Sequence, residues 1–115
     1  MIFSAPLKLN HIFRRLYHSG SQAGNRYMVV YCRKNHTEGN RVGFTVSKKL
    51  GKAVVRNRVR RRLREIYRLN EQTLLCGFDL VIVARGAAVD ASYAQLDASF
   101  HTLTNRLQLT KGQQP

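Results

Sequence analysis

Three stretches of the 115-residue chain carry apolar residues at the spacing of an α-helix. The first predicts a short helix over residues 10–18, with Asn10 as its N-cap and Gly20 just beyond its end. The second, over residues 53–69, has a narrow stripe of Val55, Val59, Leu63 and Ile66, which polar Asn70 continues. The third begins at a capping box of Ser92 and Gln95. Its predicted core stripe is Tyr93, Leu96, Phe100, Leu103 and Leu107.

Three other stretches have the character of β-strands. Residues 27–32 form a β-prone run, and residues 41–47 alternate, with Val42, Phe44 and Val46 on one side. We expect these two runs to pair antiparallel, with turns over residues 19–25 and 34–40. Residues 78–84 are apolar almost throughout, which is typical of a strand buried on both faces.

The order of these elements predicts an α+β fold. A first helix is followed by a β-β-α-β-α core, which leaves room for an extra short strand. We expect these elements to form a two-layer sandwich, with the helices on one face of the sheet. We expect one domain over residues 1–115, with a frayed tail at 111–115. Periodicity does not fix the order of the strands.

The charge balance points to a polyanionic partner. Twenty Lys and Arg against six Asp and Glu give a formal net charge of +14, which repels itself in the free protein. Nucleic acid is the usual partner of such a chain. Apolar residues make up 43% of the chain, so bulk disorder is not expected.

Half of the basic residues lie between Ser47 and Arg68, where Glu65 is the only acid. On a helical wheel the apolar stripe spans about 80°. Arg56 and Arg58 flank the stripe. The opposite side carries Asn57, Arg60, Arg61, Arg64 and Arg68. A helix held by one face and presenting guanidinium groups on the other suits the phosphates of a structured RNA, because the planar fork of Arg binds a phosphate through two hydrogen bonds.

Two other interpretations of this basic helix stay open. It could be an ordinary solvated face, although such faces mix both signs of charge. It could also lie on an anionic membrane, but its apolar side lacks the Trp and Phe typical of that role. No apolar run approaches the ~20 residues of a membrane span, and no signal peptide is evident, so we expect a cytoplasmic protein without a membrane partner.

The run from Arg41 to Glu65 resembles the signature of the protein subunit of bacterial ribonuclease P. In that family a VSKK sequence at a strand end (residues 46–49), a Gly-x-Ala-Val turn (51–54) and an Arg-Asn-Arg helix (56–58) occur in this order and spacing. The FDLVIVAR run over residues 78–85 and the aromatic first helix are also similar to that family, so the resemblance covers nearly the whole chain.

The resemblance implies more than periodicity can show. Its fold joins parallel strands through the Arg-rich helix by a left-handed crossover, as in the second domain of ribosomal protein S5, against the usual hand. It also implies that the helix and its preceding turn hold the catalytic RNA of ribonuclease P. With Arg68 of the same row, the expected residues are Lys48, Lys49, Lys52, Arg56, Asn57, Arg58, Arg60, Arg61, Arg64 and Arg68. Arg62 departs from the family, which usually has an aliphatic residue there, so we expect it to snorkel or to reach RNA.

A second surface of the family lies between the first helix and the sheet, and takes the 5′ leader of precursor tRNA. By position it would consist here of Phe13, Tyr17 and Tyr31. Aromatic platforms with nearby cations bind single strands with little base preference. The alternative is that the three rings are ordinary core residues.

The function implied is therefore the protein subunit of an endoribonuclease whose RNA subunit removes the 5′ leader from precursor tRNA. No catalytic residue and no protein-held metal are expected, because His11 and His18 lack acidic partners and the six acids are scattered. Mg²⁺ should matter but be held mainly by the RNA, and no DNA partner is expected. Cys32 and Cys76 should be buried free thiols, because each falls in or beside an apolar stretch. The rivals are a ribosomal or RNA-chaperone protein of the same fold, and a free-standing nuclease.

Overall fold

A computed structural model describes residues 4–6 and 10–111, with side chains from residue 13 onward. Residues 112–115 of the predicted tail lie outside the described residues, as do the side chains of Asn10 and His11. The elements in chain order are β1 (Ser4–Pro6), α1 (Asn10–Ser19), β2 (Ser21–Gly24), β3 (Met28–Lys34), β4 (Asn40–Thr45), η1 (Lys48–Leu50), α2 (Ala53–Asn70), η2 (Glu71–Thr73), β5 (Phe78–Ala84), η3 (Gly86–Ala88) and α3 (Tyr93–Arg106).

The strands form one five-stranded sheet in the order β1-β4-β5-β3-β2. The predicted antiparallel pairing of residues 27–32 with 41–47 is wrong, because β5 lies between β3 and β4. The reason is burial. The apolar β5 has Leu80, Val81 and Ile82 all at most 1% exposed, so it takes the centre, where both of its faces are covered.

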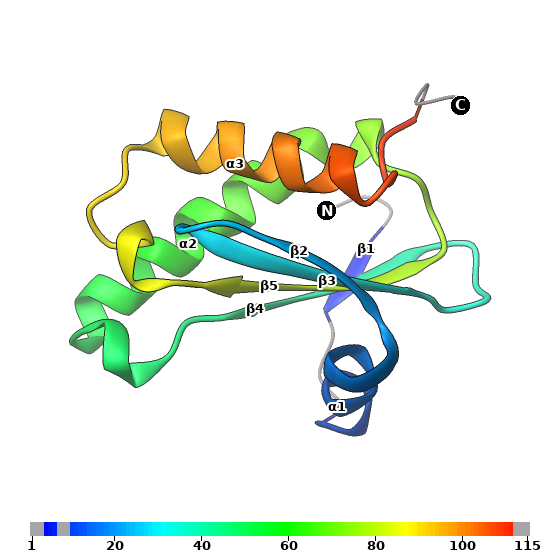
Figure 1. Cartoon of the computed structure of the whole chain (residues 1–115), viewed down its shortest axis with the longest axis horizontal. Coiled ribbons are helices and arrows are strands. Elements are labelled where there is room, and N and C mark those ends of the chain that lie inside the picture. The colour runs from blue at the N-terminus through cyan, green and yellow to red at the C-terminus, as the bar shows by residue number, and fades with distance from the viewer. Residues whose placement is uncertain (1–3, 7–9, 112–115) are drawn as a thin grey trace.

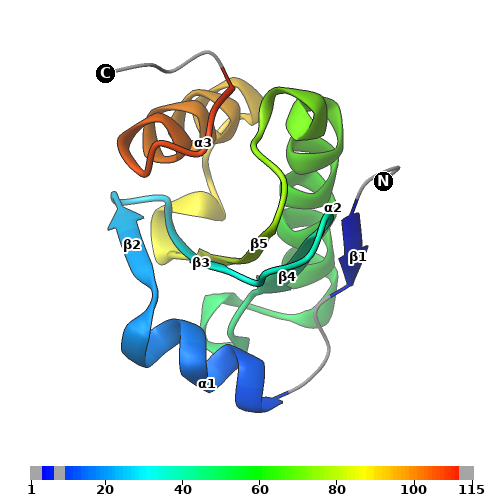
Figure 2. The same cartoon turned by 90° about the vertical axis from the view of Figure 1, so that its right-hand side faces the viewer.

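The parallel strands β4 and β5 are joined through α2 by a left-handed crossover, which confirms the expected fold. In Figure 1 both strands run from right to left, so they point away from the viewer in Figure 2, where β5 lies to the left of β4 and α2 lies on the upper side of the sheet. The chain therefore turns to the left as it passes over the sheet. This hand is rare among such connections.

Two of the three helices cover one face of the sheet, as the sandwich predicts. The main core packs α2 and α3 against the inward residues of β3, β4 and β5, including Val30, Val42 and Ile82. The sandwich also predicts the first helix on this face, and that part is wrong. Figures 1 and 2 show α1 on the opposite face, where Leu16 packs against Val81 in a second, smaller cluster.

The short strand β2 occupies a stretch that the sequence predicts as a turn. Its polar sequence gives little alternation, but Gln22 pairs with Tyr31 and Ala23 with Val30 across an antiparallel hairpin. The Asn25 side chain closes this hairpin by accepting hydrogen bonds from the backbone N–H groups of Tyr27 and Met28, at 2.9 and 3.1 Å. A turn residue at the right offset therefore sets the register.

The last helix begins as predicted, since Ser92 and Gln95 form a complete capping box. Leu96, Phe100 and Leu103 are buried in the main core. Tyr93, assigned to the same stripe, is 38% exposed, so that assignment is wrong. As the first residue of α3 it precedes the turn that packs on the core.

Candidate RNA interface

The turn between β4 and α2 gathers lysines at the start of a long helix. Ser47 accepts a hydrogen bond at its hydroxyl from the backbone N–H of Lys49, at 3.2 Å, which starts the single turn η1. Gly51 has a φ of 141°, a conformation that favours glycine, and lets the chain reverse into α2. Lys48, Lys49 and Lys52 are all exposed around this turn.

The N-terminus of α2 carries positive charge without compensation from its own side chains. Lys52 is the N-cap and makes no side-chain capping bond, and the first turn contains no acid. The free N–H groups and the helix dipole already favour an anion at such an end. Lysines in place of the usual Ser or Asp cap strengthen that preference.

The apolar stripe of α2 holds the helix on the sheet and turns its other side outward. Val59, Leu63 and Ile66 are at most 2% exposed, as predicted. Tyr67, which the stripe omitted, is fully buried between Phe44 and Phe100 at ring-centroid distances of 6.2 and 6.3 Å. The basic residues of α2 are thus fixed to a rigid support.

Arg58 and Arg61 are the most available arginines of this helix. Both are exposed, and neither side chain makes a hydrogen bond or ion pair within the described part of the chain. Their guanidinium groups therefore keep their full capacity to donate to phosphate oxygens.

The other predicted RNA-binding residues of α2 have partners on the protein. Arg56 donates from Nε to the carbonyl oxygen of Gly51 at 3.1 Å, and Arg60 donates to the side chain of Asn57 at 3.2 Å. Arg64 lies 6.0 Å from the ring centroid of Phe44. These contacts orient the side chains but neutralise no charge.

Arg68 differs, because it forms a two-bond ion pair with Glu65 at 2.5 and 3.2 Å. The hydrogen bond from Arg68 lowers the pKa of the Glu65 carboxyl. Arg68 therefore offers less uncompensated charge than Arg58 or Arg61.

Arg62, expected to snorkel or to reach RNA, makes a hydrogen bond to the protein itself. Its Nη1 donates a 3.1 Å hydrogen bond to the carbonyl oxygen of Ala91, just before α3. The side chain is half-buried at the edge of the stripe. This arginine ties α2 to the loop that starts α3, while its neighbour Arg61 faces outward.

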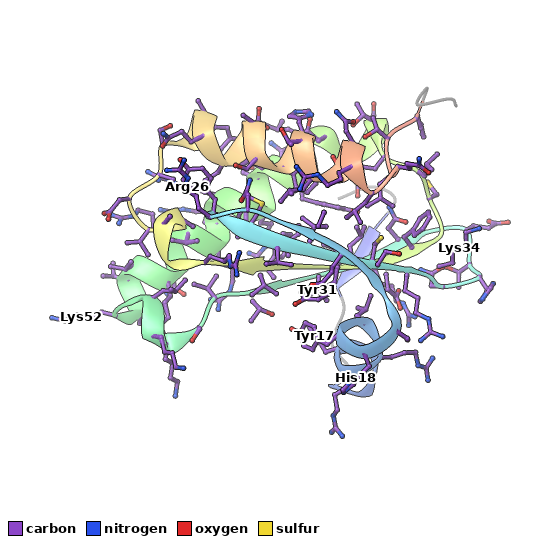
Figure 3. The ribbon with its side chains drawn as sticks, viewed as in Figure 1. Tyr17, His18, Arg26, Tyr31, Lys34 and Lys52 are labelled. Carbon is purple, nitrogen blue, oxygen red and sulfur yellow. The ribbon has the colours of Figure 1, made fainter. Side chains whose placement is uncertain are left out.

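The three predicted aromatic residues meet at the junction of α1 and the sheet. The Tyr17 and Tyr31 rings lie edge to face at 4.9 Å, and the Phe13 ring lies 6.5 Å from that of Tyr17. Phe13 and Tyr31 are half-buried and Tyr17 is 42% exposed. In Figure 3 Tyr17 and Tyr31 lie on the same side of α1. None of the three belongs to the main core, so they form a partly open aromatic surface.

The His, Cys, Asp and Glu side chains of the described residues are scattered. Among the described residues no three His, Cys, Asp or Glu side chains come together as metal ligands. His18 is exposed, and His101 lies 3.6 Å from Asp97 on the outside of α3. Cys32 and Cys76 are both free thiols, as expected, but only Cys32 is buried. The expected burial of Cys76 is wrong, because this residue lies in the bend just before β5. Burial raises the pKa of Cys32 to about 11.

Comparison with known proteins identifies the family of this chain. The family model described as Ribonuclease P matches residues 3–108, nearly the whole chain. The chain belongs to the ribonuclease P protein family. The ribonuclease P protein component of Alkaliphilus oremlandii is 42% identical over 103 residues, covering 90% of each chain. That of Clostridioides difficile is 42% identical over 105 residues, covering 90% of this chain and 92% of the relative.

Solved structures of ribonuclease P proteins have the same fold. The Staphylococcus aureus protein superposes with a TM-score of 0.84 at 33% identity, covering 92% of this chain and 97% of that one. The Thermotoga maritima protein superposes with a TM-score of 0.77 at 31% identity, covering 84% and 92%. Membership assigns this chain the role of a ribonuclease P protein component with an RNA partner, which agrees with its charge of +14. Among the described residues no helix is long and apolar enough to cross a membrane.

Proposed function

We propose that this ribonuclease P protein binds the catalytic RNA through α2 and the preceding turn, and binds the 5′ leader of precursor tRNA through its aromatic surface. The RNA subunit would carry out the phosphodiester hydrolysis. The observation that supports this most strongly is the outward pair Arg58 and Arg61, two guanidinium groups without partners among the described residues, on a helix anchored by its opposite face.

Binding to the RNA subunit would be made mainly through phosphates. The lysines of η1, the uncapped N-terminus of α2 and the arginines of α2 follow one another along one continuous segment, and all of them donate hydrogen bonds that suit phosphate oxygens. Arg and Lys contacts to phosphate fix the position of a protein on RNA without reading sequence. This is what a subunit that recognises the shape of one folded RNA requires.

Binding to the leader would use the rings of Phe13, Tyr17 and Tyr31. Their partial exposure leaves ring surface on which unpaired bases can stack. Stacking tolerates any base sequence, which suits leaders that differ from one precursor tRNA to the next.

Mg²⁺ would be held mainly by the RNA subunit. The absence of a cluster of three possible ligands among the described residues is consistent with this proposal. When bound to RNA phosphates the ion supplies charge neutralisation and an activated water. The protein would contribute by adding cations and so lowering the Mg²⁺ concentration at which the complex is active.

Reconstitution tests this proposal. Purified protein alone should leave precursor tRNA intact, and adding the cognate RNA subunit should restore cleavage at a lower Mg²⁺ concentration than the RNA needs by itself. Cleavage by the protein alone, from a preparation shown free of other nucleases, would contradict the assignment of the chemistry. An unchanged Mg²⁺ requirement would contradict the role of the protein's cations.

A further inference from the structure

A small basic pocket lies behind α1, away from the aromatic surface. It has a volume of about 100 Å³ and is lined by side chains from α1, the end of β3, β4 and the start of β5. The charged residues among them are Arg15, Arg33, Lys34, Arg41 and Asp79. Figure 3 shows Lys34 on the far side of α1 from Tyr17 and Tyr31.

The helical repeat explains why α1 separates two surfaces. Leu16 is 1% exposed and faces the sheet. At about 100° per residue, Phe13 and Tyr17 project on one flank of Leu16 and Arg15 on the other, nearly opposite to the two rings. The same short helix thus presents aromatics to one side and a guanidinium group to the other.

The sheet adds a cross-strand row of charge on the same face. Arg33 of β3 and Arg41 of β4 are both in register with Asp79 of β5, which lies between them. Arg41 donates to both carboxylate oxygens of Asp79, at 2.7 and 2.8 Å, and Asn35 donates to the first at 3.2 Å. Asp79 is 6% exposed, and its negative charge is compensated by Arg41, which it holds in place.

The other cations of the pocket are not neutralised. Arg33 donates to the hydroxyl of Ser19 at 3.1 Å, and that hydroxyl donates to the backbone carbonyl of Arg15 at 2.9 Å. Neither Arg15, Arg33 nor Lys34 has a carboxylate within ion-pair distance in the part of the chain that the structure describes. Four cationic groups therefore share one small concavity with a single, already paired carboxylate.

An anion would relieve this repulsion. A tetrahedral phosphate group matches the size of the pocket, and guanidinium groups bind its oxygens in pairs. Arg33 and Arg41 are held in fixed orientations, by Ser19 and by Asp79, so binding restricts these side chains little further.

We propose that this pocket, formed by Arg15, Arg33, Lys34 and Arg41, binds a phosphodiester group of an RNA strand at a second site separate from α2. The inference rests on the proposed RNA-binding function and adds a second binding site to it. The RNA subunit and the precursor tRNA offer the same phosphodiester chemistry, so the experiment distinguishes between them.

The double variant R15Q/K34Q removes two cations of the pocket and leaves the hydrogen bonds that hold Arg33 and Arg41 intact. Neither side chain has a hydrogen bond within the described residues, whereas Arg33 and Arg41 keep theirs. The matched control R106Q/K111Q removes two exposed charges, one on the last residue of α3 and one in the segment that follows it. Affinity is measured against salt concentration for the RNA subunit, leadered precursor tRNA and leaderless tRNA.

Relative to this control, R15Q/K34Q should bind the RNA that fills the pocket roughly tenfold more weakly, with a log–log salt slope shallower by about one unit. Affinities equal to the control for all three RNAs would overturn the inference. Arg58→Ala in the same assay distinguishes a failure of the pocket from a failure of the RNA-binding function proposed for α2. If it weakens binding to the RNA subunit while R15Q/K34Q weakens binding to none of the three RNAs, only the pocket is wrong. If neither variant weakens any binding, the proposed function of α2 fails as well.

A titration of the free protein with inorganic phosphate provides a direct readout. At constant ionic strength the Nε–Hε resonances of Arg33 and Arg41 should shift and saturate, and R15Q/K34Q should weaken that binding. Shifts that rise linearly without saturation, or that chloride reproduces, would contradict a built phosphate site.

Discussion

Arg62 donates a 3.1 Å hydrogen bond from Nη1 to the carbonyl oxygen of Ala91, and thereby joins α2 to the segment that starts α3. Its neighbour Arg61 is exposed and has no partner among the described residues. Two adjacent arginines of one basic run therefore have different roles, one structural and one directed outward.

Arg62→Ala should destabilise the protein by about 1–2 kcal/mol, because the variant has neither the charge-assisted hydrogen bond nor the packing of the alkyl chain. Arg61→Ala should change the free energy of unfolding by less than ~0.5 kcal/mol, as expected for an exposed site. Urea unfolding of both variants measures the difference. Equal stabilities would show that the Arg62–Ala91 bond contributes nothing in solution.

Phe13→Ala and Tyr31→Ala should each weaken binding of leadered precursor tRNA by about 1–3 kcal/mol, since each removes a stacking surface. Binding of leaderless tRNA and of the RNA subunit should not change, and leaders of different sequence should be affected alike. Both rings are half-buried in the small cluster under α1, so unfolding must be followed on the same samples. Equal weakening for leadered and leaderless tRNA, or early unfolding, would identify them as packing residues.

Burial raises the pKa of the Cys32 thiol from an ordinary 9.0 to about 11, while Cys76 is exposed. A disulfide reagent at pH 8 should therefore modify Cys76 quickly and Cys32 only when the protein unfolds, because the thiolate is the reactive form. Cys76→Ser should remove the fast phase. Two fast equivalents in the native wild-type protein would contradict the burial of Cys32.

The same shift has a consequence for stability. The native state binds the Cys32 proton more tightly than the unfolded state does. The protonated thiol therefore adds to the free energy of unfolding below pH 9.0, and this stabilisation is lost as the pH rises to about 11. In Cys32→Ala that part of the alkaline decline in stability should be absent.

Sulfate should stabilise the isolated protein more than chloride does at equal ionic strength. Ions that bind the native basic surfaces stabilise by mass action, by about 1.4–2.7 kcal/mol at roughly 10 to 100 times Kd. The measurement is thermal unfolding of the protein in the two salts. The same comparison on R106Q/K111Q shows how far the difference between the salts depends on total charge alone. Identical midpoints in the two salts would mean that screening alone acts on the charge of +14.

The local elements of this fold follow from the sequence more closely than their arrangement does. The stripe of Val59, Leu63 and Ile66 and the capping box at Ser92 are local patterns, and both are confirmed. The placement of β5 between β3 and β4 depends on long-range competition for the buried centre of the sheet, which periodicity does not report.

The candidate site shows the same division. The run of charge locates the basic helix, but only the structure separates Arg62, which binds Ala91, from Arg61 beside it. The row Arg33, Asp79 and Arg41 comes from three strands far apart in the sequence. No spacing along the chain could have predicted it.

The central claim is that the outward side of α2 binds RNA phosphates. The most direct test compares Arg58→Ala and Arg61→Ala with Arg62→Ala, measuring affinity for the ribonuclease P RNA subunit as a function of salt concentration under conditions where all three are folded. The account predicts that the first two bind more weakly, with log–log slopes shallower by roughly one unit for each phosphate that the variant no longer binds, and that Arg62→Ala keeps the wild-type slope. Wild-type slopes in both Arg58→Ala and Arg61→Ala would contradict it.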